Sequence, residues 1–229
     1  MLKISTHKLI MTKILKAIYS DISIAGVLGF KGGTALYLFH NLPRFSVDLD
    51  FDLLDESKKD LVFKAVTKIV GKFGELRDNR EKHFNLFWLL SYEKGQTQLK
   101  VEISKRSFGS SYEVKNYFGM PVLIMKKEDM LANKLAALMD RKNLANRDIF
   151  DIWFMLNNNW DLNDKLLELR TNTKVNVYLG KCLDLLEKNP PTNILDNIGD
   201  LLDNKTKDWA KKNLVKDTIF LLKLNFRGK

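Results

Sequence analysis

The sequence has few of the residues that build disulfide, zinc or membrane proteins. It contains one cysteine, Cys182, and three histidines, so an internal disulfide and a cysteine–histidine zinc site are excluded. With only 4 prolines and 12 glycines in 229 residues, it is not a fibrous or low-complexity chain. No run approaches the ~18 apolar residues of a membrane span, and lysines interrupt the N-terminal segment where a secretory signal would be apolar. We therefore expect a cytoplasmic protein with a substantial core.

The sequence has fewer acidic residues than basic residues. The chain has 38 Lys and Arg against 28 Asp and Glu, a formal net charge of +10. This balance favours a polyanionic partner such as nucleic acid or nucleotide phosphate, and a solvated helix face is the alternative. Part of the excess comes from six lysines on a predicted C-terminal helix: Lys205, Lys207, Lys211, Lys212, Lys216 and Lys223.

The hydrophobic spacing predicts strands and helices in the first half of the chain and helices alone in the second. The first half shows helical segments over 6–22, 35–41 and 57–73 and extended segments over 26–30, 46–54, 84–92, 97–104 and 121–125, the last as an edge strand. The second half shows helical segments over 127–141, 146–158, 162–169, 174–188, 192–203 and 206–225. We expect an α+β fold, with a small mixed-sheet domain over 1–122 and an all-helical domain over 123–229.

The segment 46–54, SVDLDFDLL, alternates strictly between apolar and polar residues. Asp48 and Asp50 therefore share one face of a strand, about 6.6–7 Å apart at Cα, which is close enough to share a divalent cation. Glu102 is on the outward face of a later strand that could pair beside them. Together with Asp52, these aspartates repel one another unless cations compensate them. The wet side of a half-buried sheet is the alternative interpretation of this pattern.

A glycine pair, Gly32-Gly33, separates a short apolar run from a helix-like segment, and Thr34 is the predicted N-cap of that helix. Backbone N–H groups at a helix N-terminus favour a phosphate. Carboxylates on a strand beside such a turn are what metal-dependent phosphoryl chemistry requires.

Two segments resemble the first motif of the AbiEii/AbiGii toxin family, part of the nucleotidyltransferase superfamily typified by DNA polymerase β. They are Lys31–Leu36, KGGTAL, and Arg44–Phe51, RFSVDLDF. Asp129–Ala137 is similar to the family's "D, four residues, K" helix, and Arg147–Ile152 is similar to its R-D-x-x-D element. The resemblance covers about residues 28–155.

The resemblance implies a metal-dependent nucleotidyltransferase, the toxin of a toxin–antitoxin or phage-defence pair. Such an enzyme transfers a nucleoside monophosphate from an NTP to an acceptor such as the 3′ end of a tRNA, and a cognate antitoxin is implied as a partner. Asp48 and Asp50 would hold Mg²⁺ or Mn²⁺, with Glu102 as third ligand or base. The nucleotide-binding candidates are Gly32, Gly33, Thr34, Arg44, Ser46 and Lys134.

The later motifs place charged residues on neighbouring predicted helices. Lys134 would reach from the helical domain into the cleft and hold triphosphate oxygens, and Asp148 would orient it or bind the incoming hydroxyl. An interhelical salt bridge is the alternative for both residues, and Asp151 is expected to be mainly structural. The aromatics Phe84, Phe87, Trp88, Trp153 and Phe154 are expected to pack in the core.

Two other functions fit the same residues. The first is nucleotidylation of a small molecule or a protein, against which only the basic C-terminal segment argues. The second is a non-catalytic module that binds an NTP. The three carboxylates argue against it, because a site without catalytic activity does not require Asp48, Asp50 and Glu102 to lie close together.

Overall fold

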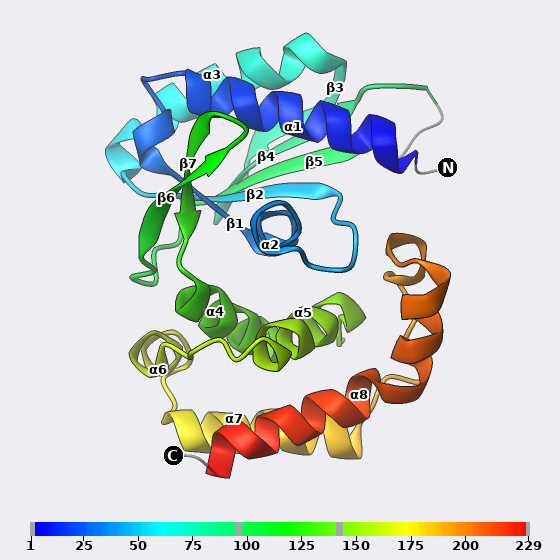
Figure 1. Cartoon of the computed structure of the whole chain (residues 1–229). Helices are drawn as coiled ribbons and strands as arrows, with labels where there is room; N and C mark the ends of the chain where they lie inside the picture. Colours follow the sequence, from blue (N-terminus) through cyan, green and yellow to red (C-terminus); the bar gives the residue numbers. More distant parts are fainter. Residues whose placement is uncertain (1–2, 95–97, 141–143, 228–229) are drawn as a thin grey trace. The chain divides into compact units, whose positions relative to one another are not determined.

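The computed structural model describes residues 3–94, 98–140 and 144–227. The chain divides into two compact units. The first comprises Met1–Asn41, Phe45–Ser107 and Ser111–Met125, and the second comprises Leu42–Arg44, Phe108–Ser110 and Lys126–Lys229. The second unit thus takes in two short segments that the predicted boundary at 122/123 leaves out. The first unit mixes strands and helices and the second is helical (Figure 1), which confirms the α+β class.

One mixed sheet of seven strands forms the centre of the first unit, in the order β3-β4-β5-β2-β1-β7-β6. The strands are β1 (Leu28–Lys31), β2 (Asp48–Leu53), β3 (Glu75–Glu81), β4 (Asn85–Ser91), β5 (Leu99–Ser104), β6 (Tyr112–Tyr117) and β7 (Met120–Met125). The central strand β2 runs antiparallel to β1 and parallel to β5. This pairing brings two of the predicted acidic strands side by side.

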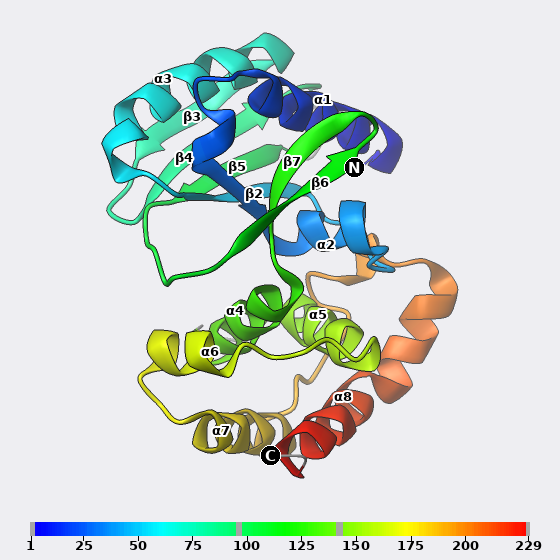
Figure 2. The same ribbon diagram turned by 60° about the vertical axis from the view of Figure 1, so that its left-hand side comes forward.

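Three α-helices accompany the sheet: α1 (Ile4–Ser20), α2 (Gly32–His40) and α3 (Lys59–Val70). The helices α1 and α3 lie side by side on one face of the sheet (Figures 1 and 2). On that face the ring of Tyr19 contacts Phe51 of β2, and Trp88 of β4 donates a hydrogen bond to Thr67 of α3. Because side chains alternate along a strand, the aspartates of β2 point to the opposite face.

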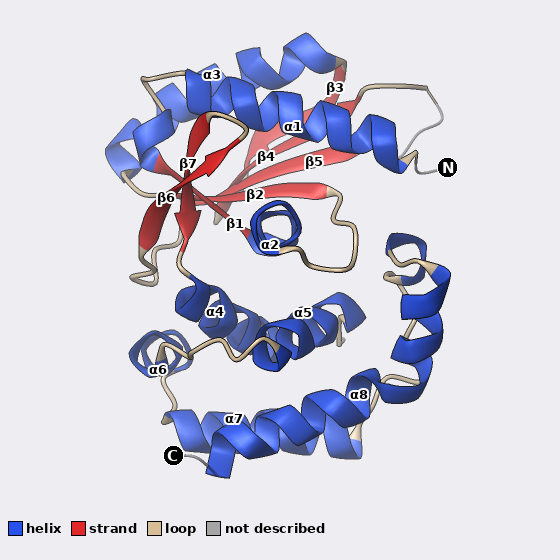
Figure 3. Cartoon of the chain, in the orientation of Figure 1, coloured by secondary structure: helices blue, strands red, loops and turns tan. Residues whose placement is uncertain are grey.

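The described part of the second unit contains five α-helices, shown in Figure 3. They are α4 (Lys127–Asp140), α5 (Asn146–Asn157), α6 (Asp164–Thr171), α7 (Val175–Lys188) and α8 (Asn204–Arg227). The helix α5 packs against α4 and α8, and α7 packs against α8. The rings of Trp153 and Trp209 pack in a tilted arrangement, with centroids 4.1 Å apart, and join α5 to α8. Among the described residues no helix is long and apolar enough to cross a bilayer.

Two strands are missing from the prediction, and both lie at an edge of the sheet. The sequence of β3, ELRDNRE, is polar on both faces and has no residue buried as deeply as those of the central strands, so it shows no alternation. At the other edge β6 pairs with β7, which makes the prediction of 121–125 as an edge strand wrong. A two-sided polar edge strand carries no hydrophobic period from which to predict it.

The buried stripe of α3 comprises Val62, Val66, Ile69 and Val70. The predicted helix over 192–203 is wrong. Over 192–203 the structure has only a 3-10 turn, Gly199–Leu201. There Asn193 accepts a hydrogen bond from the backbone N–H of Leu195, a local bond that competes with helix formation. The first residue of the predicted strand over 97–104, Thr97, lies outside the described residues.

Candidate active site

The carboxylates of β2 and β5 stand side by side on one face of the sheet. In the parallel pairing, Asp48 is opposite Lys100 and Asp50 is opposite Glu102. The alternate residues Leu49 and Val101 are fully buried on the other face. Glu102 therefore lies on the strand next to Asp50 and points away from the core, in the position that the alternation of the sequence predicts.

The ammonium group of Lys100 lies among these carboxylates. Its Nζ is 3.3 Å from Asp48 Oδ2 and 3.7 Å from Glu102 Oε2. Although burial works against its charge, the nearby carboxylates of Asp48, Asp50 and Glu102 raise the pKa of Lys100 above its usual value. Burial, together with the charge of Asp48, raises the pKa of Asp50, and Lys100 and Lys31 counteract that shift. The cluster thus combines acidic groups with a resident cation.

The negative charge of Asp52, the third aspartate of β2, is compensated by other residues. Asp52 Oδ1 is 2.5 Å from Lys31 Nζ, and Asp52 Oδ2 accepts a hydrogen bond of 2.5 Å from the hydroxyl of Tyr112. The side chain of Asp52 is largely buried. The chain therefore neutralises this aspartate with its own residues, which leaves Asp48 and Asp50 as the candidates for metal binding on β2.

The start of β2 is fixed from two helices. His7 of α1, fully buried, contacts the backbone oxygen of Val47 through Nε2 at 2.8 Å and the hydroxyl of Tyr92 through Nδ1 at 2.7 Å. Thr34 of α2 donates its hydroxyl to the backbone oxygen of Asp48. Burial lowers the pKa of His7, partly offset by the Val47 bond and the Asp48 charge. These contacts position the backbone that carries Asp48.

The glycine pair begins α2 itself, so the prediction of Thr34 as its N-cap is wrong. The N-cap is Lys31, Gly32 is the first helical residue, and Thr34 is buried within the first turn. Gly32 has φ 79°, and a Cβ built on it would lie 2.6 Å from Asp50 Oδ2. The missing side chain is thus what lets the helix start approach the Asp50 carboxylate.

Two further nucleotide-binding candidates are buried. Gly33 lies within the first turn of α2, and Ser46 in the segment before β2 is 8% exposed. The backbone N–H groups of the first helical turn have no partner inside the helix. The first turn of α2 therefore presents donors next to Asp50, the arrangement that favours an anion.

Glu102 has an additional partner on β4. The side-chain amide of Asn85 donates a hydrogen bond to Glu102 Oε1. In the antiparallel pairing of β4 with β5, Phe87 is directly opposite Glu102, and Asn85 is on the same strand face two residues away. Asn85 therefore holds one oxygen of Glu102, while the other faces Lys100.

A separate cluster of charged residues lies in the second unit. It contains Lys134, Asp148 and Asp151 of the later motifs, together with Arg44 of the first motif. Arg44 donates two hydrogen bonds of 2.7 Å to the carboxylate of Asp151. Lys134 Nζ is 2.9 Å from Asp148 Oδ1 and 2.7 Å from Asp151 Oδ2. Although burial opposes its charge, the two carboxylates raise the pKa of Lys134. Arg44, predicted to touch a phosphate, is 3% exposed and engaged with Asp151.

This cluster has the geometry of the salt bridge that the sequence leaves as an alternative. Asp148 and Asp151 are buried on α5, and Lys134 reaches them from α4. Within each unit, then, the structure brings together one part of the predicted residue set: Asp48, Asp50 and Glu102 in the first, and Arg44, Lys134, Asp148 and Asp151 in the second.

A comparison with protein families identifies the chain. A family model described as "Nucleotidyl transferase AbiEii toxin, Type IV TA system" matches residues 13–213. The chain belongs to the AbiEii nucleotidyltransferase toxin family. It is therefore a nucleotidyltransferase of a type IV toxin–antitoxin family, as the three sequence motifs predict. An NTP substrate and an antitoxin partner follow from the family at this general level.

Several solved structures share the fold of this chain. JHP933 from Helicobacter pylori has a TM-score of 0.66 and 23% identity, over 99% of this chain and 93% of that one. A second H. pylori protein, described as a nucleotidyltransferase, gives 0.62 and 22%, over 98% and 95%. The antibiotic-resistance factor ANT(2″)-Ia gives 0.50 and 15%, over 73% and 91%. No curated protein matches the chain.

Four residues around the AbiEii carboxylates are absent from the sequence prediction. Lys100 alternates with Glu102 on the outward face of β5, so the strand pattern alone could have indicated it. His7, Asn85 and Tyr112 act through contacts between segments far apart in the sequence. Their spacing carries no signal for those contacts. Phe84, predicted to pack in the core, is instead 50% exposed.

Proposed function

We propose that this chain transfers a nucleoside monophosphate from an NTP to the 3′-terminal hydroxyl of an RNA such as a tRNA, with a divalent metal ion bound by Asp48, Asp50 and Glu102. The observation that carries the proposal is the register of β2 and β5, which aligns Asp50 with Glu102 on the face of the sheet opposite α1 and α3. Nucleotidyl transfer itself follows from the family.

The donor set fits a hard divalent cation. Mg²⁺ and Mn²⁺ prefer carboxylate oxygens, and these three residues supply only such oxygens. The position of the Lys100 ammonium supports the fit, because the carboxylates surround a positive charge. Among the described residues no three Asp, Glu, His or Cys side chains are already arranged around a single metal position. When bound, the ion would lower the pKa of the acceptor hydroxyl and neutralise the leaving pyrophosphate.

The chain's own groups have defined parts in the proposed reaction. The acceptor oxygen forms a bond to the α-phosphorus, the bond from that phosphorus to the bridging β-oxygen breaks, and pyrophosphate leaves. The hydroxyl proton passes to a base, a role that the family resemblance implies for Glu102. The N–H groups at the start of α2, beside Asp50, would bind phosphate oxygens.

The motif that contains Lys134 suggests a role for the second unit in binding the triphosphate. Lys134 would contact the triphosphate as a compact point charge, and Asp148 and Asp151 orient its ammonium. This role stays a prediction that a variant of Lys134 tests.

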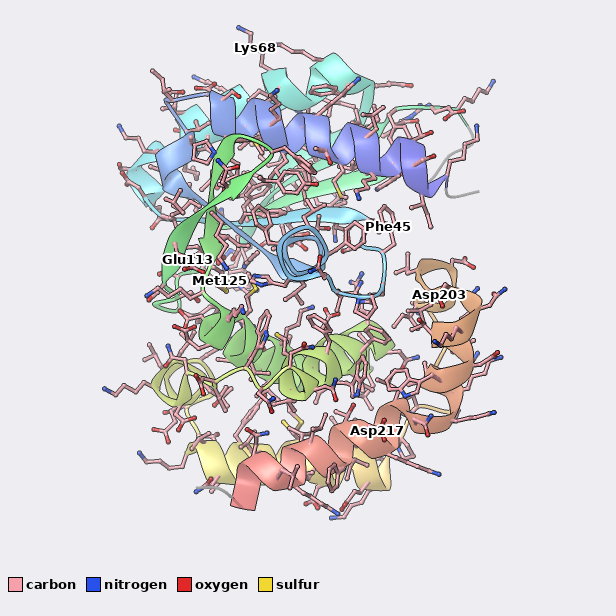
Figure 4. All side chains as sticks on the ribbon, viewed as in Figure 1. Phe45, Lys68, Glu113, Met125, Asp203 and Asp217 are labelled. Atoms are coloured by element: carbon pink, nitrogen blue, oxygen red, sulfur yellow. The ribbon has the colours of Figure 1, made fainter. Side chains whose placement is uncertain are left out.

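The charge of α8 supports RNA as the acceptor. Lys205, Lys212 and Lys216 are exposed and make no ion pair with any residue that the structure describes. Lys223, by contrast, is 2.6 Å from Glu187, and Lys211 is 3.8 Å from Asp208. The helix carries few acidic residues. Asp203 lies before it and Asp217 lies on it (Figure 4). Asp208 also belongs to α8.

A groove beside these lysines also supports RNA as the acceptor. It has a volume of about 480 Å³. One side is formed by α8, and the other by the end of α7 and the segment that follows α7. Lys211, Lys212 and Lys216 line it, together with Pro190 and Ile219. Cations along an apolar groove are suited to a nucleic-acid strand, whose phosphates and base faces need both kinds of contact.

The test is to incubate the protein with each α-labelled NTP, Mg²⁺ and total RNA, and to identify the labelled product on a denaturing gel. Label at an RNA 3′ end supports the proposal. Label on protein or on a small molecule instead supports the alternative acceptors, and no transfer to any acceptor contradicts the proposal.

The RNA surface has a separate test. We expect RNA affinity to fall steeply between 50 and 200 mM salt, because phosphate contacts release counterions. Replacing Lys205, Lys212 and Lys216 by Gln should lower the slope of log Kd against log salt by roughly two, while NTP binding is unchanged. The same slope in the variant, or no RNA binding at low salt, would show that these lysines are only a solvated helix face.

A further inference from the structure

Lys100 occupies a position in the carboxylate cluster that the proposed metal ion would also need. Its Cα is the register partner of Asp48 across the parallel pair of β2 and β5. Its Nζ lies between Asp48 Oδ2 and Glu102 Oε2, at 3.3 and 3.7 Å. The side chains are 29% exposed for Lys100, 18% for Asp48 and 27% for Glu102. The ammonium therefore sits at the partly solvated edge of the carboxylate set.

The groups around Lys100 explain why an ammonium lies there. Asp48 and Asp50 face it from β2 and Glu102 from its own strand, and the residue opposite it on β4 is the uncharged Leu89. Three carboxylates on adjacent positions of one sheet face repel one another unless a cation is among them. Lys31, the other nearby lysine, is 2.5 Å from Asp52 and is engaged there. Lys100 is thus the lysine that compensates Asp48 and Glu102.

A second cation cannot join the same oxygens without repelling the first. Two positive charges within about 4 Å repel one another at the effective dielectric of a protein surface. Lysine has a flexible four-carbon stem and a single point charge, so its ammonium can withdraw toward solvent. The exposed part of Lys100 leaves that route open.

We infer that Lys100 is a resident counter-ion that competes with the divalent metal for Asp48 and Glu102 and withdraws when the metal binds. This inference rests on the proposed function, because it requires that the carboxylates bind a metal. Lys100 is a positioning residue in this account: it holds the carboxylates together before the metal arrives and reduces the intrinsic metal affinity of the free protein.

The experiment is a Mn²⁺ titration of the full chain without nucleotide, followed by the electron paramagnetic resonance signal of free Mn²⁺. The wild type is compared with Lys100→Met, which keeps most of the stem and removes the charge. We expect Lys100→Met to bind Mn²⁺ about tenfold more tightly. Unchanged or weaker binding would overturn the inference.

Lys105→Met is the matched control. Lys105 lies just after β5 and pairs with Glu81 at 2.5 Å, so its replacement removes the same charge from the same unit without touching Asp48 or Glu102. An equal gain in affinity in this control would mean that net charge, and not competition at the site, explains the result, and would also overturn the inference. Lys100→Gln gives the same comparison if Lys100→Met does not fold.

A thermal measurement provides a second readout. Without metal, Lys100→Met should melt at a lower temperature than the wild type, because the carboxylates lose their counter-ion, and Mn²⁺ should raise its melting temperature more than that of the wild type. An equal Mn²⁺ response in both would contradict the inference.

Asp48→Asn separates this inference from the function on which it rests. If Asp48→Asn abolishes Mn²⁺ binding and Lys100→Met leaves it unchanged, the metal site is retained and competition by Lys100 is wrong. If neither the wild type nor Lys100→Met binds Mn²⁺, both the metal site and the inference are wrong. Binding by Lys100→Met alone would support both.

Discussion

Asp50 on β2 stands directly opposite Glu102 on β5 in a parallel strand pair. The two residues are 52 positions apart in the sequence, yet the register places both side chains on the face that α1 and α3 do not cover. Asp48 and Lys100 form the next cross-strand pair on that face. The candidate site is therefore a property of one strand pair, and changes near that pair should affect it most.

The start of α2 offers a sensitive position near Asp50. We expect Gly32→Ala to reduce nucleotidyl transfer and to destabilise the fold by about 1–3 kcal/mol. Its φ of 79° is strained for alanine, and the new Cβ would lie 2.6 Å from Asp50 Oδ2. Transfer assays and thermal melts measure the two effects.

Gly26→Ala is the control for this substitution. A Cβ at Gly26 meets nothing within 4 Å, so alanine should leave both activity and melting temperature close to those of the wild type. Wild-type transfer by Gly32→Ala would show that the approach of α2 to Asp50 does not matter for the reaction.

The buried cluster of the second unit gives a stability prediction. Lys134→Met leaves Asp148 and Asp151 buried with one cation fewer, and Arg44 alone still pairs with Asp151. We expect a loss of about 3–5 kcal/mol of unfolding free energy. Denaturant unfolding measures it, and Lys181→Met, at an exposed position of α7, should change it by less than about 0.5 kcal/mol.

The kinetics of Lys134→Met distinguish its two roles. If Lys134 contacts the triphosphate, the folded variant should show a raised KM for NTP and a lowered kcat at a temperature well below its melting point. Wild-type kinetics with a large fall in stability would assign Lys134 to the salt bridge alone.

His7 predicts how stability depends on pH. Because burial lowers its pKa in the folded state, the unfolded chain, with a pKa near 6.5, binds a proton more readily. Its contribution is therefore present at pH 7 and above and declines as the pH falls from about 6.5 toward the lowered value. We expect the melting temperature of His7→Gln to change less between pH 7 and pH 5 than that of the wild type.

His83→Gln provides the comparison for His7. His83 is exposed between β3 and β4, so its replacement should leave the wild-type pH dependence in place. If His7→Gln and His83→Gln have the same profile as the wild type, the buried imidazole does not govern acid sensitivity.

The sequence predicts much of the central sheet because strict alternation appears there. In β2 every second residue is aspartate and the others are buried, so both the strand and the face of its carboxylates follow from the pattern. The edge strands β3 and β6 could not be predicted in this way, because neither strand has a buried apolar face. The predicted start of α2, with Thr34 as N-cap, is wrong because Gly32, at φ 79°, is itself the first residue of the helix.

The motifs predict which residues carry charge, but not which charges pair. Arg44 and Asp151 are 107 residues apart, and only the folded chain shows that one forms two hydrogen bonds with the other. Lys100 is similar: alternation places it beside Glu102, whereas its contact with Asp48 depends on the parallel register of β2 and β5. Pairing of distant segments is set by tertiary packing, which local spacing does not encode.

The most direct test of the account is transfer of label from an α-labelled NTP to RNA by Asp48→Asn beside the wild type. We expect the substitution to lower transfer by at least about 100-fold, because a carboxylate ligand of the proposed metal is lost. The melting temperature should stay near that of the wild type, and Asp60→Asn, at an exposed position of α3, should retain full activity. Wild-type transfer by folded Asp48→Asn would contradict the central claim that the β2–β5 carboxylates form the catalytic site.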